Sequence, residues 1–166
     1  AGGRRLEMAG GRIFNGVFEA VLGADVARAL DYQLDEEIVI AHGAGKVSFV
    51  KHDDKPFTVV GILQRTGTPV DQTVHVPLEG IEAIHIDWHD GAPVPGQSIS
   101  AQQALTMDLS PKVVTAFFVG LKSRIAAFSV QRFVNQYSQE PLLAILPGVS
   151  LQELWSLIGV AENALL

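Results

Sequence analysis

Three runs of β-branched and aromatic residues follow one another in the first half of the chain, and they constrain the fold more than any other feature. The runs are Glu37 to His42, Lys46 to Lys51 and Pro56 to Leu63. They are separated only by Gly43 to Gly45 and by His52 to Lys55, short connectors of the length that joins neighbouring antiparallel strands. The sequence therefore predicts a β-rich lobe.

The segments on either side of these runs predict one further strand each, followed by a short helix. Phe18 to Leu22 is an apolar run before a helical pattern over Ala24 to Leu30, and Thr73 to Val76 is a strand before a helical pattern over Leu78 to Ile86. Residues 1 to 16 hold five Gly and three Arg without periodicity, so we expect an irregular N-terminal segment.

A change in composition divides the chain after about residue 90. Residues 91 to 111 are rich in Pro, Gly, Gln and Ser with scattered apolar positions, and they predict a loop or linker, partly disordered. We therefore expect a β-rich lobe over 17 to 90 and a second lobe over 112 to 149.

The second lobe reads as a β-α-β unit. Val113 to Leu121 predicts a buried strand, a helix is expected from Ser123 to about Tyr137, and Leu142 to Leu146 predicts the returning strand. Within the helix, the apolar face is assigned to Ile125, Phe128 and Phe133 and the wet face to Arg124, Gln131, Asn135 and Ser138.

The last segment, residues 150 to 166, has the pattern of an amphipathic helix. Pro147 and Gly148 end the preceding strand, and Ser150 is a suitable N-cap. An apolar stripe then runs to the last residue through Leu151, Leu154, Trp155, Ile158, Ala161 and Leu165. Because neither a stop signal nor an initiator Met is present, we expect an excised piece of a longer chain that continues beyond Leu166.

The composition excludes several classes of function. A net charge of −6 argues against nucleic acid and anionic membrane surfaces as leading partners. Without Cys, the chain cannot form disulfides, zinc-thiolate sites or a thiol nucleophile. No apolar run approaches the roughly 20 residues of a membrane helix.

Known catalytic motifs do not fit the sequence. Gly43-Ala44-Gly45-Lys46 resembles a phosphate-binding loop, but Ile40 stands where that loop needs its first Gly and Val47 where it needs Ser or Thr. The common hydrolase signatures are absent as well. We therefore predict no enzymatic activity, no catalytic residue and no cofactor in this domain.

One weak candidate for a metal site remains, formed by His85, Asp87 and His89. On a strand these alternate residues would share one face, as in a facial metal triad. At a helix end, however, Asp87 would point away, and His near a helix C-terminus is favoured by the helix dipole alone. The capping interpretation is the stronger one, and no metal is assigned.

The order of segments resembles the extracytoplasmic domain of MacB/FtsX-like ABC transporter permeases. The resemblance covers roughly Gly11 to Leu166. Its most specific parts are the loop Thr66, Gly67, Thr68, Pro69, Val70, Asp71 after the Val-Val-Gly-Ile-Leu strand, and the Leu-Leu-Ala-Ile-Leu-Pro-Gly segment before the last helix. It also includes the run from Phe18 to Ala27 and the closing Leu-x-x-Leu-Trp helix.

The resemblance implies an α+β domain on the periplasmic face of the bacterial inner membrane, with a mobile, Sabre-like lobe over 17 to 90 and half of a porter-like lobe over 112 to 149. Residues 150 to 166 would form a stalk leading to a membrane helix. Family members have a further segment before Gly11 that completes the porter-like lobe.

The implied mechanism is mechanical: ATP hydrolysis by a cytoplasmic ABC ATPase subunit moves the extracytoplasmic lobes, which act on a lipoprotein, peptide, lipid or partner protein. A second permease subunit is the other implied partner.

Two other interpretations stay open. Residues 89 to 111 could close over a small molecule in a soluble binding domain, or His85, Asp87 and His89 could serve a metal-dependent hydrolase. Convergent polar groups in a pocket would favour the first, and a bound metal the second.

Overall fold

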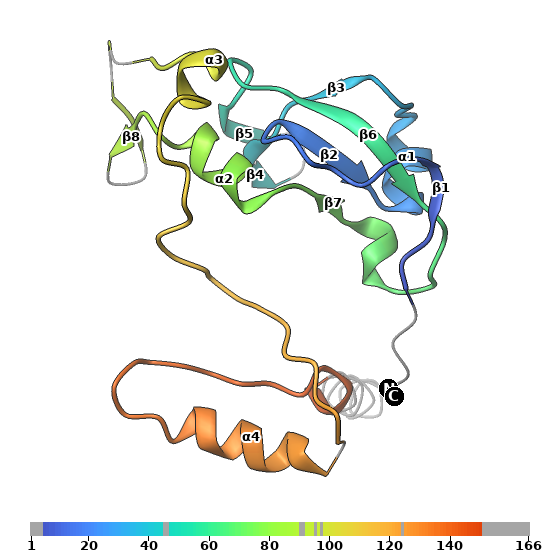
Figure 1. Cartoon of the computed structure of the whole chain (residues 1–166), viewed down its shortest axis with the longest axis vertical. Coiled ribbons are helices and arrows are strands. Elements are labelled where there is room, and N and C mark those ends of the chain that lie inside the picture. The colour runs from blue at the N-terminus through green and yellow to red at the C-terminus, as the bar shows by residue number, and fades with distance from the viewer. Residues whose placement is uncertain are drawn as a thin grey trace, which may run out of the picture. The chain divides into compact units, whose positions relative to one another are not determined.

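The computed structural model of the chain describes residues 5–44, 47–89, 92–94, 96, 98–123 and 125–150. The chain divides into two units, with the boundary between Thr115 and Ala116. The unit before the boundary is built around a sheet, and the later one contains helix α4 (Ala126–Asn135) (Figure 1). The protein therefore belongs to the mixed α and β class, with a mixed sheet and a few short helices.

Strand β6 (Phe57–Leu63) organises the first unit because three other strands pair with it. β2 (Glu19–Leu22) runs parallel to one edge of β6. β1 (Met8–Gly11) and β3 (Glu37–Ile38) run antiparallel to β6, at its C-terminal and N-terminal ends respectively. β7 (Val74–His75) extends the sheet beyond β2, which gives a mixed sheet of five strands.

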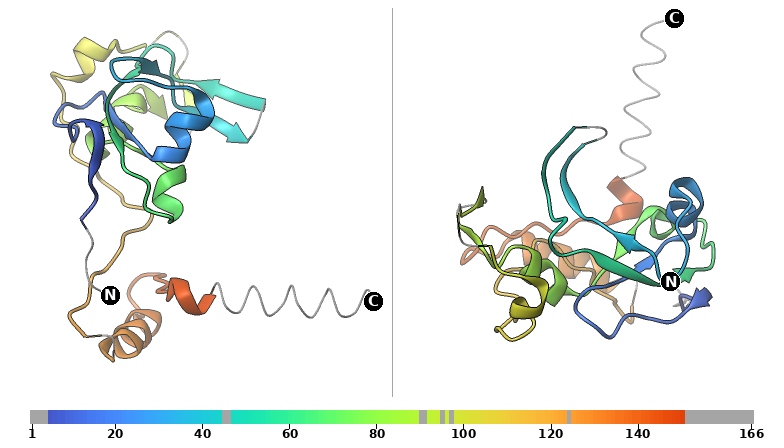
Figure 2. Two further views of the ribbon diagram at one scale, coloured as in Figure 1. Left: turned by 90° about the vertical axis from the view of Figure 1, so that its right-hand side faces the viewer. Right: turned by 90° about the horizontal axis from the view of Figure 1, so that it is seen from above.

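The sheet departs from the predicted order in two places. The predicted hairpin is present as β4 (Ala41–Ala44) and β5 (Val47–Lys51), but β5 does not continue onto β6. Both edges of β6 are already occupied, so the hairpin extends away from the sheet (Figure 2). In addition, the N-terminal segment, expected to be irregular, contributes β1. Neither the pairing of β1 with β6 nor the separation of β5 from β6 has a local sequence signal.

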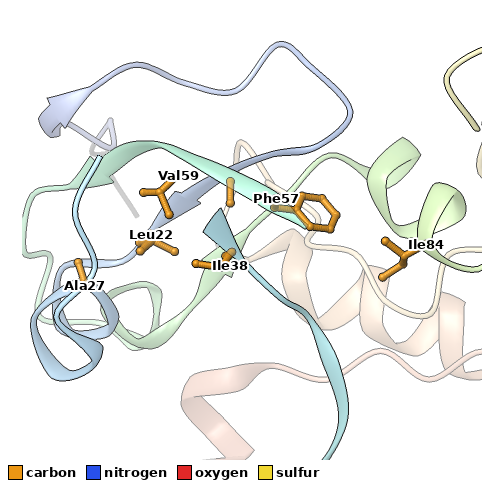
Figure 3. Close-up of a cluster of buried hydrophobic side chains, with 7 residues drawn as sticks. Leu22, Ala27, Ile38, Phe57, Val59 and Ile84 are labelled. Carbon is orange, nitrogen blue, oxygen red and sulfur yellow. The ribbon is translucent and has the colours of Figure 1, made fainter. Parts of the chain in front are cut away.

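The core of this unit lies against one face of the sheet. Side chains of β6 alternate between buried and half-buried, as expected for a strand with one face toward the core. The buried cluster, most of which Figure 3 labels, consists of Ala20, Leu22, Ala27, Ile38, Phe57, Val59 and Ile84. These residues come from strands and helices on both sides of the hairpin, so the cluster joins elements distant in sequence.

Helix α1 (Ala24–Leu30) forms where its apolar spacing predicts it, and it begins after Gly23. A Cβ atom at position 23 would lie 2.2 Å from the carbonyl oxygen of Val70, so only glycine allows the backbone of the 66–71 loop to approach this closely. The start of α1 is thereby packed against the 3-10 helix Pro69–Gln72.

The described part of the predicted loop or linker over 91 to 111 contains two short elements and belongs to the first unit. Helix α2 (Leu78–Ile84) is followed by a turn, then by the short strands β8 (Trp88–His89) and β9 (Ala92–Pro93), and then by α3 (Ala101–Ala104). Ser100 and Gln103 form a reciprocal capping box at the start of α3.

A second apolar cluster holds this segment on the sheet unit. Ala104 and Leu109 are buried against Ala83 of α2, with Phe18 and Ile99 packed around them. Scattered apolar residues in a polar segment are enough to order it when they meet a preformed apolar surface, a contact that its composition does not reveal.

The predicted β-α-β unit is not formed in the described residues. Helix α4 (Ala126–Asn135) confirms the central helix, although it is shorter than expected. Residues 113–121 and 142–146, predicted to be strands, form no strand and belong to no sheet, and the backbone bends at Thr115. A strand is stabilised by a ladder and a covering layer, and the described residues provide neither for these runs.

The orientation of α4 is opposite to the predicted one. Gln131 is half-buried, and both Gln131 and Asn135 donate side-chain hydrogen bonds to the carbonyl oxygen of Ala144, at 3.2 and 3.3 Å. The predicted apolar face, formed by Ile125, Phe128 and Phe133, is exposed. The polar side therefore faces the 142–146 segment.

The predicted start of the last helix is also shifted. Residues 147–150 are already helical, and the amides of Val149 and Ser150 donate to the carbonyl oxygen of Leu146. Pro147 thus occupies the first helical turn, where its missing N–H costs nothing, instead of separating a strand from a helix. The stripe of Leu151, Leu154, Trp155 and Ile158 lies outside the described residues, as does the stalk proposed for it. Among the helices that the structure describes, none has the length and apolar character needed to cross a membrane.

Candidate functional site

The loop from Thr66 to Asp71 is held by a single buried carboxylate. Asp71 accepts hydrogen bonds from the Thr66 amide, the Thr66 hydroxyl and the Gly67 amide, each at 2.7 Å. Gly67 has a φ of +70°, and Asp71 brackets the loop through backbone amides. The loop is therefore fixed from within.

Burial raises the pKa of Asp71, but the hydrogen bonds from Thr66 and Gly67 outweigh it, and the net pKa lies below the ordinary value. The carboxylate therefore stays charged, and its two oxygens accept the hydrogen bonds from Thr66 and Gly67. Gly67, Thr68 and Pro69 are exposed on the outer side of the loop. The arrangement presents a surface loop whose shape is fixed by Asp71.

The candidate metal ligands do not converge. His85 follows the end of α2 and its Nδ1 bonds the carbonyl oxygen of Ile81 at 2.8 Å, which is the capping arrangement considered for it. Asp87 is ion-paired with Lys55, and His89 is exposed at the end of β8. Across the part of the chain that the structure describes, no group of three His, Asp or Glu side chains is placed to hold a metal.

Asp87 instead belongs to a buried ion pair that joins two distant turns. The Lys55 side chain is only 1% exposed, and its ammonium nitrogen lies 3.1 Å from Asp87 Oδ2 and 2.5 Å from Asp54 Oδ2. Asp87 Oδ2 also accepts the Ile99 amide at 3.1 Å. Burial raises the pKa of Asp87, but the hydrogen bonds from the Ile99 amide and from Lys55 lower it by more. The net pKa of Asp87 is therefore below the ordinary value.

Three rings reinforce the same junction between residues 52–55 and 85–88. The ring centroids of His52 and His85 are 4.8 Å apart, and each lies 4.9 Å from that of Trp88. Sequence reasoning assigned His52 to a plain polar turn and did not single out Lys55. His52 and Lys55 are buried because the segment after α2 packs against the end of the β4–β5 hairpin. No local pattern in the sequence could have revealed this contact.

The later part of the chain carries a different feature, which is a dense set of exposed apolar side chains. Before α4 these are Val113, Val114, Phe117, Phe118, Val119 and Leu121. On α4 and the following segment they are Ile125, Phe128, Phe133, Leu142, Leu143 and Ile145. Scattered exposed apolar residues are ordinary, whereas large contiguous apolar patches mark interaction sites or ligand-binding grooves.

Comparison of the chain with protein-family models, with curated proteins and with solved structures gives no match. The function is therefore argued from the residues and their geometry.

Proposed function

We propose that the chain is the extracytoplasmic domain of an ABC transporter permease subunit of the MacB/FtsX-like kind, placed at the periplasmic face of a bacterial inner membrane. In this role it has no catalytic residue and no cofactor. It couples ATP hydrolysis by a cytoplasmic ABC ATPase subunit to movement of lobes that handle a lipoprotein, peptide, lipid or partner protein. A second permease subunit completes the assembly.

One observation carries the proposal: the segment 113–146 exposes most of its large apolar side chains. A domain that works alone, as a binding protein or a hydrolase, buries such residues in its own core. A component of a larger assembly leaves them for a neighbouring polypeptide, since obligate interfaces resemble a domain core cut in half. The segment resemblance to permease domains points to the same kind of assembly.

The sheet unit supports the mechanical part of the proposal. Its core clusters, the buried Lys55–Asp87 pair and the Asp71-centred loop all lie before Thr115, and they tie the sheet, α2 and the 98–109 segment into one body. Movement of such a unit as a whole transmits displacement to whatever touches its surface loops.

The two alternatives have less support. Residues 98–109 do not stand free to close over a ligand, because Ala104 and Leu109 are buried on α2. The hydrolase interpretation needs His85, Asp87 and His89 together, and Asp87 is engaged by Lys55 and Ile99.

Co-purification from bacterial membranes tests the proposal. The natural gene product carrying this domain is tagged and solubilised in mild detergent, and associated proteins are identified by mass spectrometry. We expect an ABC-class ATPase, and we expect protease cleavage between residues 109 and 117 to differ between the nucleotide-free and the ATP-vanadate states. Recovery in the soluble fraction without such an ATPase would contradict the proposal.

A further inference from the structure

Asn15 and Gly16 lie in the loop that connects β1 to β2, and they are the one Asn-Gly pair of the sequence. In such a pair the glycine amide nitrogen can attack the side-chain carbonyl carbon of Asn, because glycine has no side chain to shield that nitrogen. The attack closes a succinimide ring, and the side-chain nitrogen leaves as ammonia with the proton of the Gly16 amide. Water then opens the ring to aspartate or isoaspartate. The pair is therefore a candidate site of spontaneous modification.

The carboxylate of Glu19 engages both amides next to the reactive carbonyl. Glu19 Oε2 accepts the Asn15 amide at 2.9 Å and the Gly16 amide at 3.1 Å. Successive amides that point at one anion form a nest, and their common direction fixes the backbone torsion between them. Ring closure needs that torsion to turn until the Gly16 nitrogen faces the Asn15 side chain. The hydrogen bond from Gly16 must therefore break before the attack.

Arg12 keeps Glu19 in place and charged. Its Nη1 and Nη2 donate to Glu19 Oε2 and Oε1 at 2.7 and 2.6 Å. The hydrogen bond from Arg12, together with those from the amides of Asn15 and Gly16, outweighs desolvation and lowers the pKa of Glu19 to about 2. At neutral and mildly alkaline pH, Glu19 is therefore negative. Its charge opposes loss of the Gly16 amide proton, and a carboxylate of such low pKa is too weak a base to remove it.

Arg12 also contacts the carbonyl that would be attacked, but only weakly. Its Nη1 lies 3.4 Å from Asn15 Oδ1, which is long for a hydrogen bond. The same nitrogen makes shorter bonds to Glu19 and to the carbonyl oxygen of Ile13. Polarisation of the Asn15 carbonyl by Arg12 is therefore a smaller effect than the hold of Glu19 on the Gly16 amide.

Gly16 is needed for this protection as well as for the reactivity. A Cβ atom at position 16 would lie 3.2 Å from Cδ and 3.3 Å from Cγ of Glu19, closer than ordinary van der Waals contact. The residue that makes Asn15 reactive thus also lets the carboxylate approach.

We infer that Asn15 is a latent modification site, which Glu19 keeps closed while the loop is folded and which converts to aspartate or isoaspartate when the loop detaches. β1 and β2 both pair with β6, so detachment of either strand frees the loop. Conversion places a second negative charge beside Glu19, and isoaspartate also adds a methylene group to the backbone. Because like charges repel, the modified loop no longer closes as before.

The rate of conversion at position 15 tests the inference on the full chain. Aspartate and isoaspartate are quantified by liquid chromatography and mass spectrometry of proteolytic peptides during incubation at mildly alkaline pH. A capped peptide of residues 10–22 is the reference without tertiary structure. We expect the full chain to convert at least about tenfold more slowly than the peptide, because a hydrogen bond to a charged group must break first. In urea, the full chain should convert as fast as the peptide does in urea.

Two matched variants separate the charge of Glu19 from the ion pair. Glu19→Gln keeps the size of the side chain but removes its charge, and it should convert at least about tenfold faster than the wild type. Arg12→Gln leaves the carboxylate on both amides, and because an exposed ion pair contributes little, its rate should change by less than about threefold. Circular dichroism establishes that each variant is folded.

Equal rates for the native chain and the peptide would overturn the inference, as would a folded Glu19→Gln variant that converts as slowly as the wild type. Faster conversion of the native chain than of the peptide would also overturn it, by showing that Arg12 or Glu19 promotes the attack. If Glu19→Gln does not fold, the native chain, the urea-unfolded chain and the peptide decide the question by themselves.

Discussion

Gly67 and Asp71 show how single residues fix the surface loop of the sheet unit. Gly67 adopts a left-handed backbone conformation, and the Asp71 carboxylate accepts hydrogen bonds from the amides of Thr66 and Gly67. The cost of each substitution can therefore be assigned to one physical cause, the backbone conformation at Gly67 and the hydrogen-bonded charge at Asp71.

Gly67→Val should destabilise the protein by about 1 to 3 kcal/mol. Apart from the adjoining residues, no atom lies within 4 Å of the position that a Cβ would take, so the cost comes from the positive φ and not from a steric clash. Gly67→Asn is the matched control, since Asn tolerates this conformation and should cost clearly less. Urea unfolding measures both, and equal free energies of unfolding for the two variants would show that the conformation is not strained.

Asp71→Asn should remove part of the acid sensitivity of the protein. Because the pKa of Asp71 is lowered by folding, its contribution to stability is complete above the ordinary value of about 3.9 and is lost as the pH falls through the lower folded value. The wild type should therefore lose more stability than the variant as the pH falls from about 5 to about 2. Parallel pH profiles of the unfolding free energy would contradict this.

Removing one partner of the Lys55–Asp87 pair should be far more harmful than removing both. Lys55→Met leaves a carboxylate that is only 9% exposed without its cation, and losses of this type reach about 3 to 5 kcal/mol. Lys55→Met/Asp87→Leu should recover part of that loss, because apolar residues avoid the desolvation of both charges. Thermal unfolding of the single and double variants is the measurement, and a double variant less stable than Lys55→Met would contradict the coupling.

At the scale of elements, α4 shows what amphipathic patterning leaves undecided. The helix forms where its sequence predicts it, but its aromatic residues face outward and its amides face the 142–146 segment. The hydrogen bonds of Asn135 to Ala144 fix that orientation.

Asn135→Ala should therefore destabilise the contact between α4 and residues 142–146 by about 1 kcal/mol, the typical net value of such hydrogen bonds. Phe128→Ser on the exposed face should change stability by less than about 0.5 kcal/mol in the isolated chain. Hydrogen exchange at the Ala144 amide reports the first change and thermal unfolding the second. A large loss of stability in Phe128→Ser would mean that this face is part of a core.

At the scale of the whole molecule, the stabilising interactions are unevenly distributed. Both apolar clusters lie between Val17 and Leu109, whereas α4 has no buried residue. The first unit should consequently unfold as one cooperative body that does not depend on the second.

A truncated chain of residues 1 to 111 should keep its main melting transition within about 4 °C of the full chain, which corresponds to a change of less than about 1 kcal/mol. The prediction follows from the two clusters, both of which the truncated chain retains. Scanning calorimetry measures the transition, and its loss or a much larger shift would show that residues 112–166 contribute to the core of the first unit.

Local patterns in the sequence determined the elements whose signal lies within a few residues. The spacing of Val26, Ala27 and Leu30 specified α1, and the Gly-rich connector specified the β4–β5 hairpin. Each depends on neighbours in the chain, and each is present in the structure.

Only the tertiary structure decided which distant segments meet. β1 joins β6 from a segment without periodicity, α3 is ordered by Ala83 of α2, and Lys55 is buried because Asp87 returns to it. The exposure of Val113–Leu121 is the converse case: its apolar pattern specified a buried strand, and the described residues contain nothing to bury it. Burial of a side chain depends on which distant segments of the chain pack against it. The pattern of apolar residues in the sequence shows only which side chains are suited to burial.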